Sequence, residues 1–322
     1  MKYTRLGRAG AQVSRIAVGT MNMGPVIGER ASFEILDEAF ERGVTFIDTA
    51  DIYGGSPWGD EPGQTEAIIG RWLASRKRRD DVVLATKVHG TMGAGVNDRG
   101  LSSVHIRAAV DASLKRLQTD RIDLYQMHHI DRNVPIDEVL DAFSCLRDQG
   151  KIVYLGSSNF AGWNIAQYQE IAAASGQPAL VTEQSLYSLA QRTIELEVGP
   201  AASAYGMGLL PWSPLAGGDL AGVLRKTDTA RSDASMLSGD RRSRIERYES
   251  FADQLGLDPA TLGIAWLLHQ TIVTAPIVGP RRLQHLLSAL DAVDVTLEDD
   301  HLATLNDIWP GPGGAAPEAY AW

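Results

Sequence analysis

The stretch that decides the fold reads VVLATK (residues 82–87), then SSVHIRAAVDASLKRL (102–117), then IDLYQM (122–127). The first and third runs are short and mostly apolar, which is typical of buried strands. The longer run between them has apolar residues at helical spacing. A strand, a helix and a second strand in this order predict a parallel β-α-β unit.

The same alternation continues in both directions along the chain. The other predicted strands are Ile16–Val18, Thr45–Asp48, Ile152–Gly156, Leu180–Glu183, Gly208–Trp212 and Thr274–Val278. Further helices are predicted at Ala31–Arg42, Thr65–Ala74, Ile136–Asp148, Ala161–Ala174, Thr193–Ala204 and Pro259–Leu268. Eight strands with helical crossovers predict an α/β fold, and their number favours a closed (β/α)8 TIM barrel.

Other segments fall outside this repeat. Lys2–Leu6 and Gln12–Arg15 flank a glycine-rich turn and predict an N-terminal β-hairpin. Thr296–Trp309 predicts an extra C-terminal helix, with the capping pattern Thr-Leu-Glu-Asp at its start. The polar stretch Ala216–Arg247 predicts a long loop that leads into a helix. No Pro- or Ser-rich linker divides the chain, so we expect a single domain over residues 1–322.

Composition narrows the class of protein. The 322 residues are 44% hydrophobic and 22% charged, as in ordinary globular proteins. The net charge of -10 argues against a nucleic-acid partner, which basic side chains would have to neutralise. The N-terminus lacks the apolar core of a signal peptide, and no apolar run is long enough to span a bilayer. We therefore expect a cytoplasmic protein with no membrane partner; the oligomeric state stays open.

Functional side chains of such barrels lie at the carboxyl ends of the strands. Polar residues follow every predicted strand end after the first: Asp48, Tyr53, Lys87, His128, His129, Ser158, Asn159, Gln184, Trp212, Ser213, Gly279, Arg281 and Arg282. Each of them alone has an ordinary structural explanation, such as a helix cap, a packed ring or a solvated lysine. Together they predict one polar site at the mouth of the barrel.

Several ordered motifs resemble the aldo-keto reductase superfamily. They are FIDTADIYG (46–54), ATK (85–87), DLYQMHH (123–129), GSSNF (156–160), EQSLYSL (183–189), WSPLAGG (212–218) and IVGPRR (277–282). The resemblance covers essentially the whole chain. It implies an NADP(H)-dependent oxidoreductase that reduces an aldehyde or ketone to an alcohol, without a Rossmann fold.

The resemblance assigns a catalytic tetrad of Asp48, Tyr53, Lys87 and His128. The chemistry agrees, because the alkoxide formed by hydride transfer needs a proton. A free phenol is a weak acid with a pKa of about 10. An ammonium beside Tyr53 is expected to lower that pKa, and Asp48 is expected to keep Lys87 charged. His128 can donate a hydrogen bond to the substrate carbonyl.

The resemblance also implies where the cofactor lies. Ser158, Asn159 and Gln184 are expected to hold the carboxamide, and Trp212 to stack on the nicotinamide. The remaining cofactor residues are Gly19, Thr20, Asp48, Ser213, Leu215, Gly217, Gly279, Arg281, Arg282 and His285. Arg281 and Arg282 at a helix start suit the 2′-phosphate of NADP. The sequence departs from the family here, with Ser288-Ala289 where many relatives carry a Glu-Asn pair and His285 where an arginine is common.

Substrate is expected to contact Met21, Asn22, Trp58, His129, Tyr320 and Trp322. The last two belong to the tail Pro310–Trp322, which is expected to fold back over the mouth. Aromatic and polar residues together suit a small-molecule carbonyl of the sugar or ring type. The alternative within the family is a reductase of a nucleotide-linked deoxysugar keto or enoyl intermediate.

Two other classes of function compete with this interpretation. A metal-dependent barrel hydrolase would use the pair His128-His129, but no HxH motif or acidic cluster accompanies it, so no metal ligand is assigned. A non-catalytic NADP-sensing subunit is disfavoured by the intact tetrad.

Overall fold

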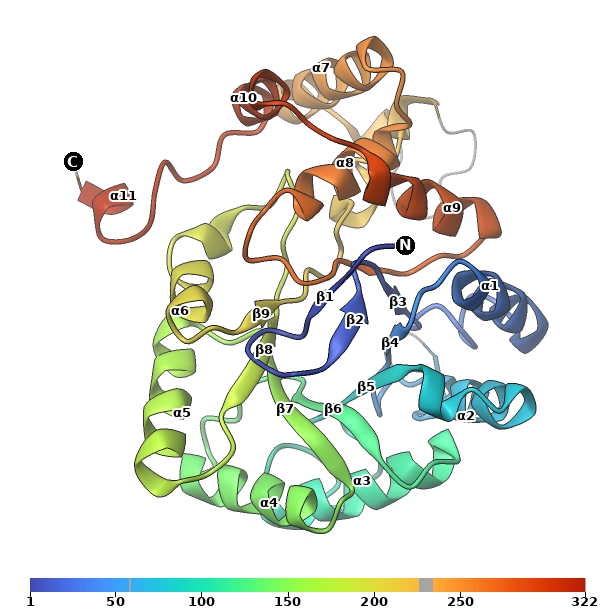
Figure 1. Cartoon of the computed structure of the whole chain (residues 1–322), viewed down its shortest axis with the longest axis vertical. Helices are drawn as coiled ribbons and strands as arrows, with labels where there is room; N and C mark the ends of the chain where they lie inside the picture. Colours follow the sequence, from blue (N-terminus) through green and yellow to red (C-terminus); the bar gives the residue numbers. More distant parts are fainter. Residues whose placement is uncertain (58, 226–233, 322) are drawn as a thin grey trace.

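The chain begins with an antiparallel hairpin. A computed structural model describes residues 1–57, 59–225 and 234–321. Strand β1 (Tyr3–Arg5) pairs with β2 (Gln12–Ser14). In Figure 1 the hairpin lies in front of the sheet. The predicted hairpin is confirmed, with slightly shorter strands.

Eight parallel strands form one curved sheet in the order β10-β3-β4-β5-β6-β7-β8-β9. Backbone hydrogen bonds also join its two ends. The N–H of Leu209 donates to the carbonyl of Ile272 at 3.1 Å, and the N–H of Thr274 donates to the carbonyl of Leu209 at 2.9 Å. The sheet therefore closes into a barrel. The strands are β3 (Ala17–Gly19), β4 (Phe46–Asp48), β5 (Val83–Val88), β6 (Ile122–Met127), β7 (Ile152–Ser158), β8 (Leu180–Gln184), β9 (Gly208–Leu209) and β10 (Ile277–Val278).

Helices surround this barrel. In Figure 1, α1 to α6 pass around its right, lower and left sides, and α7 to α10 cover the top. The helices are α1 (Glu29–Glu41), α2 (Gln64–Arg76), α3 (Ser103–Leu117), α4 (Ile136–Asp148), α5 (Gly162–Ser175), α6 (Val198–Ala204), α7 (Gly239–Gln254), α8 (Pro259–Leu268), α9 (Leu283–Asp291), α10 (Asp299–Ile308) and α11 (Glu318–Ala321). The predicted (β/α)8 barrel is confirmed.

Prolines bound two strands that are shorter than predicted, β9 and β10. Strand β9 ends before Pro211 and β10 begins after Pro276, because proline has no N–H to donate to a neighbouring strand. The predicted helix Thr193–Ala204 is split into a 3-10 helix, Thr193–Glu195, and α6. Pro200 falls in the first turn of α6, where a missing N–H has no cost.

The C-terminal helix α10 is capped differently from the sequence prediction. Its N-cap is Glu298, which forms a capping box with His301, and not Thr296. The N–H of Leu297 donates to His269 Nε2 at 3.0 Å, which fixes the preceding backbone in an extended path. The helix therefore starts three residues later than expected, at Asp299.

The interior of the barrel is apolar at the end where the strands begin. Phe46, Ala85 and Leu124 point inward from three neighbouring strands, and all are buried. Leu6 and Val13 of the hairpin segment pack against this layer. The hairpin therefore seals the end of the barrel at which the strands begin. Within the described residues, no helix is both long and apolar enough to cross a membrane.

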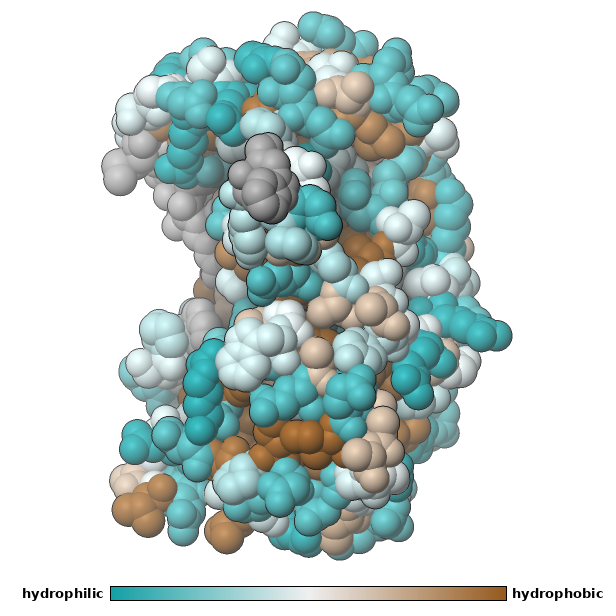
Figure 2. All heavy atoms as spheres, turned by 90° about the vertical axis from the view of Figure 1, so that its left-hand side faces the viewer, coloured by the Kyte–Doolittle hydropathy of each residue, from teal (hydrophilic) through white to brown (hydrophobic). Residues whose placement is uncertain are grey.

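The interior of the barrel is polar at the end where the strands terminate. Side chains alternate along a strand, so the residue two positions after an inward-pointing one also points inward. Counting in this way from Phe46, Ala85 and Leu124 leads to Asp48, Lys87 and Gln126, which are all buried. This polar layer lies toward the open mouth of the barrel, on the face opposite the hairpin. That face lies on the left-hand side of Figure 2.

Candidate active site

A buried lysine connects an aspartate to a tyrosine at the mouth of the barrel. Lys87 Nζ donates to Asp48 Oδ2 at 2.6 Å, to the Thr49 carbonyl at 2.9 Å and to the Tyr53 hydroxyl at 3.3 Å. Asp48 ends β4, Lys87 lies near the end of β5, and Tyr53 follows in the loop after β4. The structure thus brings together three of the four residues assigned to the tetrad.

Opposing effects set the charges of this group. Burial disfavours the ammonium of Lys87, but attraction to Asp48 and Tyr53 outweighs it and raises the pKa of Lys87 above its ordinary value. Burial likewise raises the pKa of the Tyr53 phenol, and Lys87 offsets only part of that rise. The expected lowering of the phenol pKa is therefore wrong for the free protein, although Lys87 acts in the expected direction. At neutral pH, Lys87 is charged and Tyr53 holds its proton.

His128 completes the group. Its ring meets the ring of Tyr53 edge-on, with centroids 5.9 Å apart. Burial lowers the pKa of His128 well below its ordinary value, and Lys87 and His129 act in the same direction. The ring is therefore neutral at neutral pH and keeps one N–H to donate. No cluster of potential metal ligands occurs within residues 1–57, 59–225 and 234–321.

Two glutamines hold the second oxygen of Asp48. Gln184 Nε2 donates to Asp48 Oδ1 at 2.9 Å and Gln126 Nε2 at 3.2 Å. Sequence reasoning missed Gln126. Its position on β6, two residues before His128, was the available signal, because such residues share a face of the strand. The two amides fix the carboxylate so that its other oxygen faces Lys87.

The residues expected to hold the carboxamide and to stack on the nicotinamide lie side by side. Trp212 Nε1 donates to Asn159 Oδ1 at 3.0 Å, and Asn159 Nδ2 donates to Ser158 Oγ at 3.0 Å. Ser158 Oγ in turn donates to the Gln184 carbonyl at 2.9 Å. The Trp212 ring is half-buried. The ends of β7, β8 and β9 therefore form one continuous hydrogen-bonded group beside the tetrad.

The first and last strands of the barrel are adjacent, so their terminal loops meet. Thr20 Oγ1 donates to the Asp48 carbonyl at 3.0 Å, and Asn22 Nδ2 donates to the Gly279 carbonyl at 2.9 Å. Gly19 is fully enclosed, since an added Cβ would lie 2.6 Å from an Ile277 methyl group. The predicted cofactor residues Gly19, Thr20 and Gly279 are thus structural neighbours of Asp48 and of the predicted substrate residue Asn22.

The loop after β9 carries Ser213, Leu215 and Gly217. Gly217 N–H donates to Ser213 Oγ at 3.0 Å, and an added Cβ at Gly217 would meet nothing within 4 Å. Leu215 is half-buried. The loop therefore presents an open, largely backbone surface next to Trp212, which suits the close approach of a pyrophosphate.

The predicted 2′-phosphate residues lie at the start of α9. Arg282 is its N-cap, Arg281 precedes it and His285 lies in the first turn. Arg281 is half-buried, whereas Arg282 and His285 are exposed. The N–H of Arg281 donates to His285 Nδ1 at 3.5 Å. A helix N-terminus with two guanidinium groups has the donors that a phosphate needs.

The expected substrate side has an apolar and an imidazole wall. Met21 and Met92 pack against Ala50, Ile52 and Tyr53. The polar wall begins with the imidazole of His129, which stacks on His128 with ring centroids 5.2 Å apart.

His89 extends the imidazole wall. It meets His129 edge-on, with centroids 5.5 Å apart. Sequence reasoning missed His89. The only signal was its position just after the end of β5. Histidines occur at such positions in many proteins without a functional role, so the signal was too weak for a prediction.

The predicted aromatic tail does not reach the tetrad in the contacts of the described residues. Tyr320 is 62% exposed, and its hydroxyl donates to Glu197 at 3.1 Å. The N–H of Ala316 donates to the Leu196 carbonyl at 2.9 Å. The tail therefore runs beside the connection between β8 and α6, and its substrate role stays a prediction. Trp58 and Trp322 lie outside the described residues.

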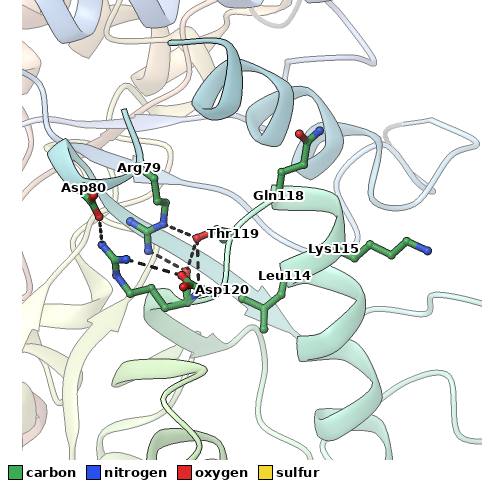
Figure 3. A pocket seen from close by; sticks show the side chains of 8 residues that line it. Arg79, Asp80, Leu114, Lys115, Gln118, Thr119 and Asp120 are labelled. Atoms are coloured by element: carbon green, nitrogen blue, oxygen red, sulfur yellow. Dashed lines mark hydrogen bonds and ion pairs between the residues drawn. The ribbon is translucent and has the colours of Figure 1, made fainter. Parts of the chain in front are cut away.

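A surface depression of about 640 Å³ lies at the opposite, sealed end of the barrel (Figure 3). Its arginines are already bound within the protein. Arg79 donates to Thr119 Oγ1 at 2.7 Å, and Arg121 pairs with Asp80 at 2.7 Å. Contacts at this end of a barrel usually serve stability, so we place the active site at the mouth.

Fold and site together define a class: a (β/α)8-barrel enzyme with a tyrosine, a lysine, an aspartate and a histidine grouped at its mouth. The family model "Aldo/keto reductase family" matches residues 15–310. The chain belongs to the aldo/keto reductase family and is an oxidoreductase, which confirms the family resemblance.

Its relatives include proteins with named substrates. The chain is 48% identical to an uncharacterized oxidoreductase, YrpG, of Bacillus subtilis, with 100% of each chain covered. It is 31% identical to the norsolorinic acid reductase of Aspergillus flavus, over 94% of this chain and 79% of the relative. It is 30% identical to the aryl-alcohol dehydrogenase [NADP(+)] of Phanerodontia chrysosporium, over 95% of this chain and 87% of the relative.

Proposed function

We propose that the protein reduces an aldehyde or ketone to an alcohol with NADPH, and that Tyr53 is the general acid. The observation that carries the proposal is the buried contact of Lys87 with both Asp48 and Tyr53. A bound nicotinamide would supply the hydride. The residues of this chain would orient the carbonyl and supply the proton.

The proton would come from the Tyr53 hydroxyl. A phenol with a raised pKa is fully protonated at neutral pH, so it is ready to donate. As negative charge forms on the carbonyl oxygen, the ammonium 3.3 Å from the phenol oxygen stabilises the phenolate that remains. Asp48 keeps that ammonium charged in a site closed to water. The neutral ring of His128 would donate its N–H to the same carbonyl oxygen.

The residues around the tetrad fit a nicotinamide dinucleotide. Asn159, Ser158 and Gln184 offer amide and hydroxyl groups beside the Trp212 ring, as a carboxamide-bearing aromatic ring requires. The open loop at Gly217 leaves room for a pyrophosphate, and the start of α9 provides arginines for a phosphate. The preference for NADP over NAD is part of the proposal and depends on Arg281 and Arg282.

The substrate that the site supports best is a ring carbonyl, above all an aromatic one. Met21, Met92 and Ile52 offer apolar surface beside Tyr53, while His89 and His129 offer flat rings. The two relatives reported above whose names give a substrate are a norsolorinic acid reductase and an aryl-alcohol dehydrogenase, and the second name points to an aryl compound. Neither name points to a nucleotide-linked sugar, so no observation favours the deoxysugar alternative.

Replacing Tyr53 by Phe tests the proposal. The variant removes one oxygen and keeps the ring, so we expect the barrel and the NADPH affinity to be preserved. The rate of NADPH oxidation with a panel of aromatic aldehydes should fall roughly 10²–10⁴-fold. If the folded variant keeps full activity, the mechanism is wrong. If the wild type binds NADPH but reduces no carbonyl in the panel, a cofactor-sensing subunit becomes the better explanation.

A further inference from the structure

Glu183 is a fully buried carboxyl group behind the proposed nicotinamide site. Its neighbour Gln184 points into the barrel, where it donates to Asp48. Because side chains alternate along β8, Glu183 faces the other side of the barrel wall. It therefore lies outside the cavity and touches neither the tetrad nor the space for substrate.

Donors from two neighbouring strand ends converge on this carboxylate. Ser157 Oγ donates to Glu183 Oε2 at 2.5 Å, and Ser185 Oγ donates to Oε1 at 2.7 Å. The backbone N–H of Phe160 donates to Oε1 at 3.2 Å. The N–H of Phe160 can only donate, so Oε1 must accept, whereas each serine hydroxyl can rotate to donate or to accept. A glutamine could keep its oxygen toward Phe160 only by turning its NH2 group toward Ser157.

These bonds fix a turn that carries Asn159. Its φ of 59° lies in the left-handed region, which asparagine adopts more often than most other non-glycine residues. The turn is held to β8 from both sides: the N–H of Asn159 donates to the Gln184 carbonyl at 3.0 Å, and the next N–H, that of Phe160, donates to Glu183. Without the carboxylate, the second of these attachments is lost.

The same carboxylate also supports Trp212. Ser185, which donates to Glu183, accepts the backbone N–H of Trp212 at 3.0 Å through its carbonyl. The Trp212 indole N–H then donates to Asn159 Oδ1 at 3.0 Å. A closed ring of contacts thus runs from Glu183 through Asn159 and Trp212 and back through Ser185.

We propose that Glu183 is the positioning residue that holds Ser158, Asn159 and Trp212 in the arrangement that presents one face of the nicotinamide to the substrate. The inference rests on the proposed function, because it assumes that these residues contact that ring. Burial raises the pKa of Glu183 to about 7, while the hydroxyls of Ser157 and Ser185 act against that rise. The group is thus costly to bury and is stabilised by the donors that it orders.

Glu183→Gln tests this role, and Glu66→Gln serves as a matched control. Glu66 is also fully buried and accepts from Thr86 at 2.6 Å and from Arg116 at 2.7 Å, and neither of these partners lies on β7 or β8. Two quantities are measured for each protein: the dissociation constant of NADPH by calorimetry, and the share of deuterium transferred from NADPH labelled on one face at C4.

At pH 8, where most of Glu183 is ionised, we expect Glu183→Gln to weaken NADPH binding roughly tenfold, the loss of one charge-assisted hydrogen bond, and to transfer a measurable share of hydrogen from the wrong face. Glu66→Gln should lower the melting temperature but change both quantities less than twofold. Wild-type affinity and complete facial selectivity in Glu183→Gln would overturn the inference.

Should that variant not fold, Ser185→Ala removes one donor and should shift both quantities in the same direction by a smaller amount. Unchanged values would again overturn the inference. A wild type that binds no NADPH at all would instead overturn the proposed function.

Discussion

The ammonium of Lys87 and the carboxylate of Asp48 are each costly to bury alone, since neither side chain is more than 2% exposed. Lys87→Met should therefore lower the free energy of unfolding by about 3–5 kcal/mol, because it leaves Asp48 charged without its cation. Activity should fall by roughly 10²–10⁴-fold, and adding Tyr53→Phe should cost little more, because the two residues act as one unit. Denaturant unfolding and steady-state kinetics measure both effects.

The double variant Asp48→Asn/Lys87→Met separates stability from catalysis. It removes both charges and keeps a side-chain oxygen at position 48 that can accept from the amides of Gln126 and Gln184. Most of the lost stability should return, while carbonyl reduction stays lost. A double variant as unstable as Lys87→Met alone would show that the uncompensated charge is not the cause of the destabilisation.

Glu183 should also make stability depend on pH. Its pKa is raised from the ordinary 4.5 to about 7, so the folded protein binds this proton more tightly than the unfolded chain does. The stability that this tighter proton binding contributes is therefore fully present below about pH 4.5. It is lost as the pH rises through about 7. The difference in unfolding free energy between wild type and Glu183→Gln should shift by about 3 kcal/mol against the wild type over this range. Urea titrations from pH 5 to pH 8 measure it, and a difference that is flat with pH would contradict the assigned shift.

At the scale of elements, the start of α9 is where cofactor choice should be decided. Arg281→Ala/Arg282→Ala should weaken NADPH binding and leave NADH binding nearly unchanged, because only NADPH carries the 2′-phosphate. Charge-assisted hydrogen bonds contribute roughly 1.5–3 kcal/mol each, so a preference of about tenfold or more should disappear. Equal losses for both cofactors would make these arginines structural, and a wild type that prefers NADH would exclude the assignment.

At the scale of the whole molecule, the stability of the barrel depends on the hairpin that seals one of its ends. Gly7, in the hairpin turn, has a φ of 56°, and an added Cβ would lie 2.2 Å from the Val181 carbonyl oxygen and 2.5 Å from the Gly208 nitrogen. Gly7→Ala should therefore destabilise the protein by about 2–5 kcal/mol, through backbone strain and overpacking. Gly10→Ala is the matched control, since nothing lies within 4 Å of its added Cβ.

Thermal unfolding compares these two hairpin variants. The control should differ from the wild type by less than about 1 kcal/mol. The NADPH affinity of folded Gly7→Ala should be unchanged, because the hairpin is at the far end from the proposed site. Equal melting temperatures for the two alanine variants would show that the hairpin does not seal the barrel.

The sequence by itself determined the order of strands and helices, the barrel they form and the strand ends at which chemistry is to be expected. It could do so because strand and helix periodicities are local, and because strand ends of a parallel barrel meet at one face whatever the details of packing. Asp48, Lys87, Tyr53 and His128 were predicted from such positions together with the family motifs. The bounds of α4 and α8 were also predicted without error.

Only the tertiary structure decided what depends on distant contacts. The Asp48–Gln184 bond joins residues 136 positions apart, and no local pattern encodes it. The raised pKa of Tyr53, the burial of Glu183 behind the nicotinamide site and the path of the tail beside Glu197 are likewise consequences of packing. Alternation along a strand tells which residues share a face, whereas desolvation and hydrogen bonding depend on everything that surrounds that face once the chain has folded.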